Sequence, residues 1–175
     1  LMGVMAAFIF AAQMINFPVA GGTSGHLLGG AIAAALLGPY GGCLAMTVVL
    51  IVQCLVFQDG GITTLGAHIL NMAVAGTAGV YPIMRLAAHA ATRRTTVIIA
   101  ASFAAWVSVV VASLLCALEL AWSGVARAEI VVPAMTVVHA LIGIVEAIVT
   151  GFFIAFLLRT RPDLVVVAGK SRPLI

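Results

Sequence analysis

The chain has 175 residues, of which 64% are hydrophobic and only 7% are charged, and its formal net charge is +3. Soluble domains carry roughly 25% charged residues, so this composition excludes a water-soluble protein and predicts an integral membrane protein. The positive charge does not indicate nucleic-acid binding, because the basic residues gather at the expected membrane edges.

Six apolar segments follow one another along the chain: 1–17, 28–38, 43–57, 64–84, 95–122 and 131–158. They are continuously apolar, which favours membrane helices over a β-barrel. The turn Gly38–Gly42 joins the two short segments either as two spans or as a re-entrant hairpin. We therefore expect an all-α integral membrane protein, with a six-helix bundle over residues 1–163 and a poorly ordered tail over 164–175.

The basic residues predict the orientation of the bundle. With six segments, the regions after the fourth and the sixth fall on the same side of the membrane, which the positive-inside rule makes cytoplasmic. The tail is then cytoplasmic, and the stretch Gly21–Gly30 faces outward. Seven of the eight basic residues lie in those two regions: Arg85, Arg93, Arg94, Arg159, Arg161, Lys170 and Arg172.

The stretch Gly21–Gly30 contains five glycines and the first histidine of the chain, His26. Glycine permits backbone conformations that pack closely on a ligand, and imidazole is a common donor for divalent transition metals. His26 is therefore the main candidate metal ligand, although a lone histidine in a loop can also be a structural hydrogen-bonding group. Ser24 beside it raises the alternative of an intramembrane hydrolase, but the segment fails the G-x-S-x-G pattern at its last position.

Four polar residues in the apolar segments form two pairs at helical spacing. His68 and Asn71 are three apart and share a helix face, so both could point into a cavity beneath the glycine-rich loop or satisfy carbonyls at a helix end. His139 and Glu146 are seven apart, on one stripe of the last segment. A carboxylate inside a membrane span is costly, so Glu146 relays ions, anchors helix packing or stays protonated.

Gly3, Ala7 and Ala11 form a stripe of small residues on the first segment. Such stripes let helices approach closely in lipid, so this one is either a docking face for another subunit or an internal packing face. The three cysteines have no CxxC spacing and are interpreted as buried apolar thiols.

Longer motifs make the chain resemble a known family over nearly its whole length, apart from residues 85–130. The sequence resembles the substrate-binding subunits of energy-coupling-factor cobalt/nickel transporters, of the CbiM/NikM type. The matching stretches are 8–18, Gly21–Gly30, Leu37–Pro39, Gln58–Ala67, Asn71–Met72, His139–Ala147 and Arg161–Leu164.

The resemblance implies a non-catalytic subunit in the bacterial or archaeal inner membrane that captures Co²⁺ or Ni²⁺ from outside as transported substrate, with a link to cobalamin synthesis. Its implied partners are a transmembrane coupling subunit, two ATP-binding subunits and a small accessory membrane protein. In the family the ion is held by the N-terminal amine, by the amide nitrogen and imidazole of the second residue, and by one loop histidine, which His26 matches. Thr23, Ser24 and Asn71 are then expected to surround the ion or gate its access.

Two departures from the family accompany this resemblance. Family members begin Met-His and carry an extra N-terminal helix, whereas this sequence begins Leu1-Met2-Gly3, so we expect it to lack that segment. Position 68 is histidine where the family typically has asparagine, which makes His68 a candidate additional donor. A passive channel is a further alternative, but it would need polar residues along a continuous path.

Overall fold

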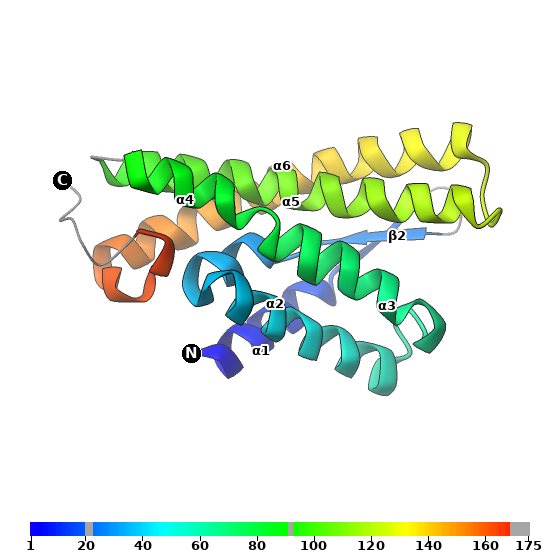
Figure 1. Ribbon diagram of the computed structural model, residues 1–175, viewed down its shortest axis with the longest axis horizontal. Helices are drawn as coiled ribbons and strands as arrows, with labels where there is room; N and C mark the ends of the chain where they lie inside the picture. The colour runs from blue at the N-terminus through cyan, green and yellow to red at the C-terminus, as the bar shows by residue number, and fades with distance from the viewer. Residues whose placement is uncertain (20–22, 91–92, 169–175) are drawn as a thin grey trace.

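The computed structural model describes residues 1–19, 23–90 and 93–168 (Figure 1). Its helices and strands follow one another as α1 (Met2–Gln13), β1 (Asn16–Val19), β2 (Thr23–His26), α2 (Gly30–Phe57), η1 (Ile62–Thr64), α3 (Leu65–His68), η2 (Ile69–Ala78), α4 (Tyr81–Ala90), α5 (Arg94–Trp122), α6 (Ala128–Thr160), η3 (Pro162–Leu164) and η4 (Val166–Ala168). The fold is largely helical, as predicted, with one short β-hairpin that the all-α prediction missed.

That hairpin changes the first predicted segment and the glycine-rich loop. Helix α1 ends at Gln13 rather than at 17, and β1 pairs antiparallel with β2 so that Asn16 lies opposite His26. Pro18 lacks a backbone N–H and disfavours helical conformation in the residue before it, so the chain becomes extended here. The prediction of a helix through residue 17 and of an irregular loop at 23–26 was therefore wrong.

The two short predicted segments lie in one element, α2, which Gly38 divides. Gly38 has φ 74° and ψ 176°, a conformation that glycine adopts readily, and Pro39 follows it. A Cβ placed on Gly42 would lie 2.9 Å from the backbone nitrogen of Ala34. Residues eight apart in a straight helix are separated by about 12 Å, so the chain must fold back at Gly38. Both predicted alternatives, two short spans and a re-entrant hairpin, contain this reversal.

The next helical run, Ile62–Ala90, contains a π-helical stretch, η2. Here Gly79 donates its backbone N–H to the carbonyl of Val74, five residues back, at 2.7 Å. Such wide turns are rare and occur frequently at functional sites. The hydroxyl of Ser108 on α5 donates to the carbonyl of Gly76, which ties η2 to its neighbour.

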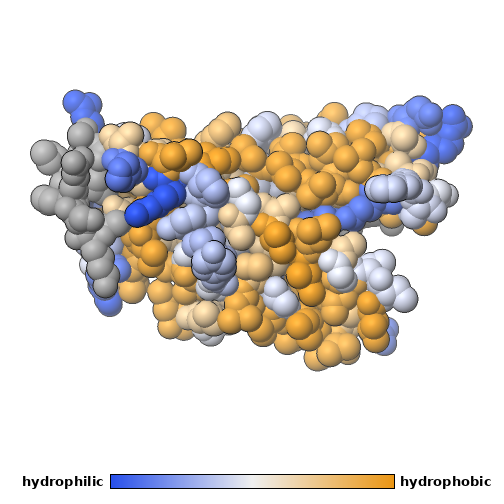
Figure 2. All heavy atoms as spheres, in the orientation of Figure 1, coloured by the Kyte–Doolittle hydropathy of each residue, from blue (hydrophilic) through white to orange (hydrophobic). Residues whose placement is uncertain are grey.

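Helices α5 and α6 are the longest and lie side by side (Figure 1). Their bounds agree closely with the predicted segments 95–122 and 131–158. In the described part of the chain, four helical segments are long and apolar enough to cross a membrane: Gly30–Phe57, Ile62–Ala90, Arg94–Trp122 and Ala128–Thr160. Figure 2 shows a broad apolar surface over the middle of the molecule and hydrophilic residues toward its two ends. This is the surface of a multi-pass membrane protein.

The two ends of the bundle differ in which segments they carry. The N-terminus and the C-terminal part of α6 lie toward one end, and β2, α3 and the connection between α5 and α6 lie toward the other (Figure 1). At the first end, Val165 and Val167 are buried in the core, so residues 164–168 of the predicted tail pack against the bundle. The rest of that tail, 169–175, lies outside the described residues.

Candidate metal centre

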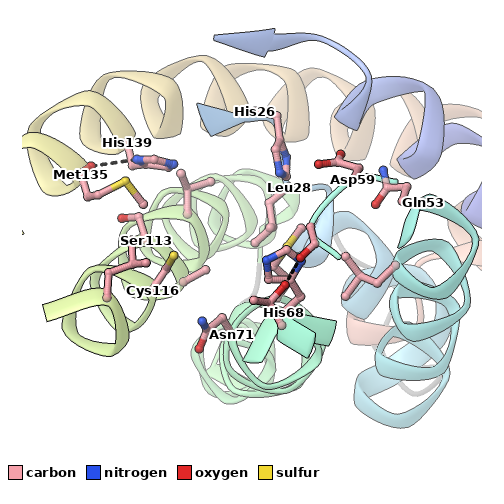
Figure 3. A pocket seen from close by; sticks show the side chains of 17 residues that line it. His26, Leu28, Gln53, Asp59, His68, Asn71, Ser113, Cys116, Met135 and His139 are labelled. Atoms are coloured by element: carbon pink, nitrogen blue, oxygen red, sulfur yellow. Dashed lines mark hydrogen bonds between the residues drawn. The ribbon is translucent and has the colours of Figure 1, made fainter. Parts of the chain in front are cut away.

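His26 is the last residue of β2 and lies at the edge of a cavity of about 410 Å³. Its Nδ1 is 2.9 Å from the carbonyl oxygen of Leu27. Because a carbonyl can only accept, Nδ1 carries the proton in this contact, and Nε2 of the neutral ring keeps the lone pair that a metal needs. Figure 3 shows the ring extending into the cavity.

Three of the four histidines line this one cavity: His26, His68 and His139. They come from β2, α3 and α6, so the cavity lies where the hairpin meets two helical segments (Figure 3). Asp59 and Gln53 also line it. Nitrogen and oxygen donors thus converge in one concave site, which is the usual form of a small-ligand site.

His68 is placed by the glycines before it. A Cβ on Gly60 would lie 2.1 Å from Cε1 of the His68 ring, and Gly60 has φ +86°. Both observations require glycine, since a side chain would collide with the ring and be strained at that φ. The loop Gln58–Gly61 therefore folds over His68 and holds it against the cavity.

Asn71 lies one turn after His68 and also lines the cavity, as expected for two residues on one helix face. It is 3% exposed, and its Nδ2 donates to Oε2 of Glu119 on α5 at 2.8 Å. Its Oδ1 is buried with no hydrogen-bond partner among the described residues. Asn71 thus connects η2 to α5 and leaves one buried acceptor oxygen beside the cavity.

His139 enters the cavity from α6, on the side facing β2. Its Nδ1 is bonded to the carbonyl oxygen of Met135 at 2.8 Å, so Nε2 is again the unprotonated nitrogen of the neutral ring. A Cβ on Gly25 would lie 3.0 Å from that Nε2. Such a Cβ would lie 2.6 Å from Cδ1 of Ile142 as well, so the strand packs closely on α6 at position 25.

Glu146 lies two turns along α6 on the same buried stripe but does not line the cavity. Its carboxylate accepts from the backbone N–H groups of Leu28 and Gly29, at 2.5 and 2.8 Å. The two residues predicted to share a stripe of the last segment therefore have different surroundings. His139 lines the cavity, whereas Glu146 binds the backbone just before α2.

The described residues do not by themselves complete a metal site. Within ranges 1–19, 23–90 and 93–168, no three His, Cys, Asp or Glu side chains lie close enough together to hold an ion. The structure brings His26, His68 and His139 to one cavity without clustering them. Of the predicted surrounding residues, Asn71 lies in the cavity wall and Thr23 and Ser24 lie in β2, where only their backbone is described.

Sequence reasoning assigned no role to several residues that shape this region. Glu119 holds Asn71, and Gln13 is 1% exposed and bonded to the carbonyl oxygen of Leu28. Each is an isolated polar residue in an apolar segment, which is the signal that did single out Glu146. Cys116 and Met135 also line the cavity and add sulfur to its wall.

The small-residue stripe is separate from the cavity. Gly3, Ala7 and Ala11 are all exposed on α1, and a Cβ on Gly3 would meet nothing within 4 Å. The described part of the bundle therefore leaves this stripe uncovered.

Residues 1–164 match the family model described as the cobalt uptake substrate-specific transmembrane region, CbiM. The chain belongs to the CbiM family. It is 42% identical over 99% of its length to a provisionally named fused nickel transport protein, NikMN, of Archaeoglobus fulgidus, of which it spans 57%. It is 33% identical over 93% of its length to the cobalt transport protein CbiM of Sorangium cellulosum, of which it spans 74%.

A solved structure supports the same assignment. One solved structure is the crystal structure of a truncated transition metal transporter, whose sequence is 31% identical to this chain. The two structures superpose with a TM-score of 0.83, and the match covers 90% of this chain and 79% of the transporter chain. The resemblance to CbiM/NikM-type proteins is thus confirmed. Its relatives are cobalt and nickel transport proteins, which does not favour the hydrolase or channel alternatives. The chain spans only 57% and 74% of the lengths of these two relatives. The similarity therefore establishes the family and not the activity of a whole transport protein.

Proposed function

We propose that the chain captures Co²⁺ or Ni²⁺ at the outer face of the inner membrane and delivers it for ATP-driven uptake by an energy-coupling-factor transporter, with cobalamin synthesis as the use of the metal. The observation that carries this proposal is the convergence of His26, His68 and His139 on one cavity in a chain of the CbiM family. Imidazole nitrogens favour these ions over Ca²⁺ and Mg²⁺, which prefer oxygen.

In this proposal His26 is the primary metal ligand among these residues, in the place of the loop histidine that the family uses. His68 adds a donor nearby. Thr23, Ser24 and Asn71 surround the ion. The hairpin β1–β2 closes over the six-helix core, where α2 contributes two helices because it folds back at Gly38.

The distribution of charges and interfacial aromatic residues supports the orientation. The described basic residues Arg85, Arg93, Arg94, Arg159 and Arg161 follow the segments that return to the end carrying Leu1, and Arg127 lies in the connection at the opposite end. Tyr40 is 88% exposed in the turn of α2 near that first end, and Trp122 is 93% exposed at the far end of α5. Aromatic residues of this kind sit at both membrane interfaces. The cavity then opens outward, and the C-terminus is cytoplasmic.

The test is transport by the intact protein in proteoliposomes. With a transmembrane coupling subunit, two ATP-binding subunits and the small accessory subunit, Co²⁺ is expected to accumulate against its gradient only when ATP is supplied. ATP is required because the proposed subunit binds metal and does not open a continuous path. Equilibration of Co²⁺ by this protein alone would instead establish the passive channel. Hydrolysis of a peptide substrate that is lost in Ser24→Ala would establish the hydrolase.

Docking of the coupling subunit is assigned in this proposal to the stripe Gly3, Ala7 and Ala11, which is exposed and free of bulky side chains. Ala7→Leu and Ala11→Leu are expected to reduce co-purification of the coupling subunit, because leucine holds the two helices apart. Metal binding by the subunit itself should be unchanged. Ala128→Leu, an exposed alanine at the opposite end of the bundle, is the matched control. A complex that survives both α1 changes would rule out this docking face.

A further inference from the structure

Two deeply buried polar side chains hold the short segment between β2 and α2. Glu146 on α6 accepts from the N–H groups of Leu28 and Gly29, and Nε2 of Gln13 on α1 donates to the carbonyl oxygen of Leu28 at 2.8 Å. Glu146 is 2% exposed and Gln13 is 1% exposed. The segment immediately after His26 is thus fixed from both sides.

The surroundings of Glu146 leave its carboxylate dependent on these contacts. Its other side borders an apolar groove of about 340 Å³ between α1 and α6, whose lining includes Phe8, Ile15 and Val149. Among the described residues, no cation forms an ion pair with it. The N–H groups and the positive end of the dipole at the start of α2 therefore offset the cost of burying this carboxylate. Any shift of the segment would leave a buried acceptor unpaired.

Gly29 joins the segment that Glu146 holds to the start of α2. It has φ +73°, a left-handed conformation that glycine adopts readily. A Cβ at this position would also lie 3.1 Å from Cγ1 of Ile9. The turn from this segment into α2 therefore favours glycine at position 29.

The contact with Leu28 also reaches His26 through a single peptide unit. The N–H of Leu28, which donates to Glu146, and the carbonyl of Leu27, which accepts from Nδ1 of His26, belong to the same peptide group. A hydrogen bond to the N–H of a peptide polarises its carbonyl and strengthens the bond that the carbonyl accepts. Stronger bonding at Nδ1–H fixes the ring and increases the basicity of Nε2, as carboxylates do when they bond directly to metal-bound histidines.

We propose that Glu146 is a positioning residue for the metal ligand His26, acting through the peptide between Leu27 and Leu28, with Gln13 fixing the next carbonyl. The inference rests on the proposed function, because it takes His26 to be a metal ligand. It gives the intramembrane carboxylate a role in metal affinity that requires no movement of ions past it.

The experiment is a titration of the intact, detergent-solubilised protein with Co²⁺, followed by calorimetry and by the visible d–d absorption of the bound ion. Glu146→Gln keeps the size of the side chain but presents an amide NH₂ to one of the two N–H groups. Affinity is expected to fall about 10–100-fold, and the d–d spectrum at saturation is expected to change. Thr150→Val is the matched control, because Thr150 is a fully buried polar residue one turn away on α6 whose hydroxyl has no partner among the described residues.

An unchanged affinity and spectrum in folded Glu146→Gln would overturn the inference, since a purely structural role would lower only the thermal stability. If that variant does not fold, Gln13→Leu decides instead: weaker Co²⁺ binding with an altered spectrum supports the inference, and wild-type values overturn it. Absence of Co²⁺ binding by the wild-type protein would overturn the proposed function itself, which keeps the two failures distinct.

Discussion

In the intact protein, His26→Ala is expected to abolish Co²⁺ and Ni²⁺ uptake and to weaken binding by more than about 100-fold, because even residues that only support a ligand change affinity by 10–100-fold. The variant should still insert and fold. The His26 side chain is only half-buried, and among the described residues its ring is bonded to the carbonyl of the next residue. Binding is measured by calorimetry on the purified protein, and uptake by metal accumulation in cells that contain the partner subunits.

His68→Asn is the matched control for this change, since it removes a second imidazole from the same cavity and restores the residue typical of the resembling family. We expect it to reduce affinity less than tenfold, a smaller effect than loss of a direct ligand. Lower pH should weaken wild-type binding, because protons compete with the metal for the imidazole nitrogens. Normal uptake by His26→Ala would remove His26 from the site and leave the cavity without its principal ligand.

The helices with uniform apolar sequence could be predicted closely, because length and hydropathy alone determine a membrane span. Predicted segments 95–122 and 131–158 correspond to Arg94–Trp122 and Ala128–Thr160. The break in α2 was visible as Gly38-Pro39, but the sequence left two spans and a hairpin open. The positive φ of Gly38 and the approach of Gly42 to Ala34 establish the reversal that both alternatives contain.

The β-hairpin could not be predicted, because its strands are four residues long and lie among glycines and a proline that indicate turns. Pairing of Asn16 with His26 depends on tertiary placement, which local propensity does not contain. The same reasoning explains why the sequence pointed to Glu146 but not to its partners. A carboxylate in an apolar segment is conspicuous, whereas the backbone N–H groups that it binds leave no trace in a side-chain pattern.

The candidate site was predicted in part for a similar reason. His26, His68 and His139 stood out as titratable residues in apolar sequence, and the structure brings them to one cavity. That His68 and Asn71 share a face follows from helical spacing alone. The bond between Asn71 and Glu119 joins residues 48 positions apart, so it required the packing of η2 against α5.

Gly30→Ala should destabilise the protein, although helix propensity predicts the opposite. Replacing glycine by alanine inside a helix ordinarily stabilises it by about 1 kcal/mol. At Gly30, however, the new methyl group would lie 2.6 Å from both the carbonyl oxygen of Gly76 and the hydroxyl oxygen of Thr77. The first of these is backbone and cannot rotate away, so α2 and η2 must separate. Overpacking of this kind costs about 1–3 kcal/mol, which equals or exceeds the gain in propensity.

The separation should also reach the metal centre. Gly30 begins α2 directly after the segment that Glu146 and Gln13 hold, and the carbonyl of Gly76 accepts from Ser108 on α5. Moving η2 away from α2 therefore strains contacts on both sides of the cavity. We expect a lower melting temperature in detergent, measured without metal, together with weaker Co²⁺ binding.

Gly66→Ala is the matched control that separates collision from propensity. Gly66 lies in α3, is exposed, and would place its Cβ more than 4 Å from any neighbour outside its own turn. The same substitution there should leave the melting temperature unchanged or raise it slightly, because only helix propensity changes. Equal behaviour of the two variants would mean that α2 and η2 do not pack through Gly30. If only Gly30→Ala lowers the melting temperature and weakens Co²⁺ binding, then the close contact between α2 and η2 is one of the interactions that hold the cavity together.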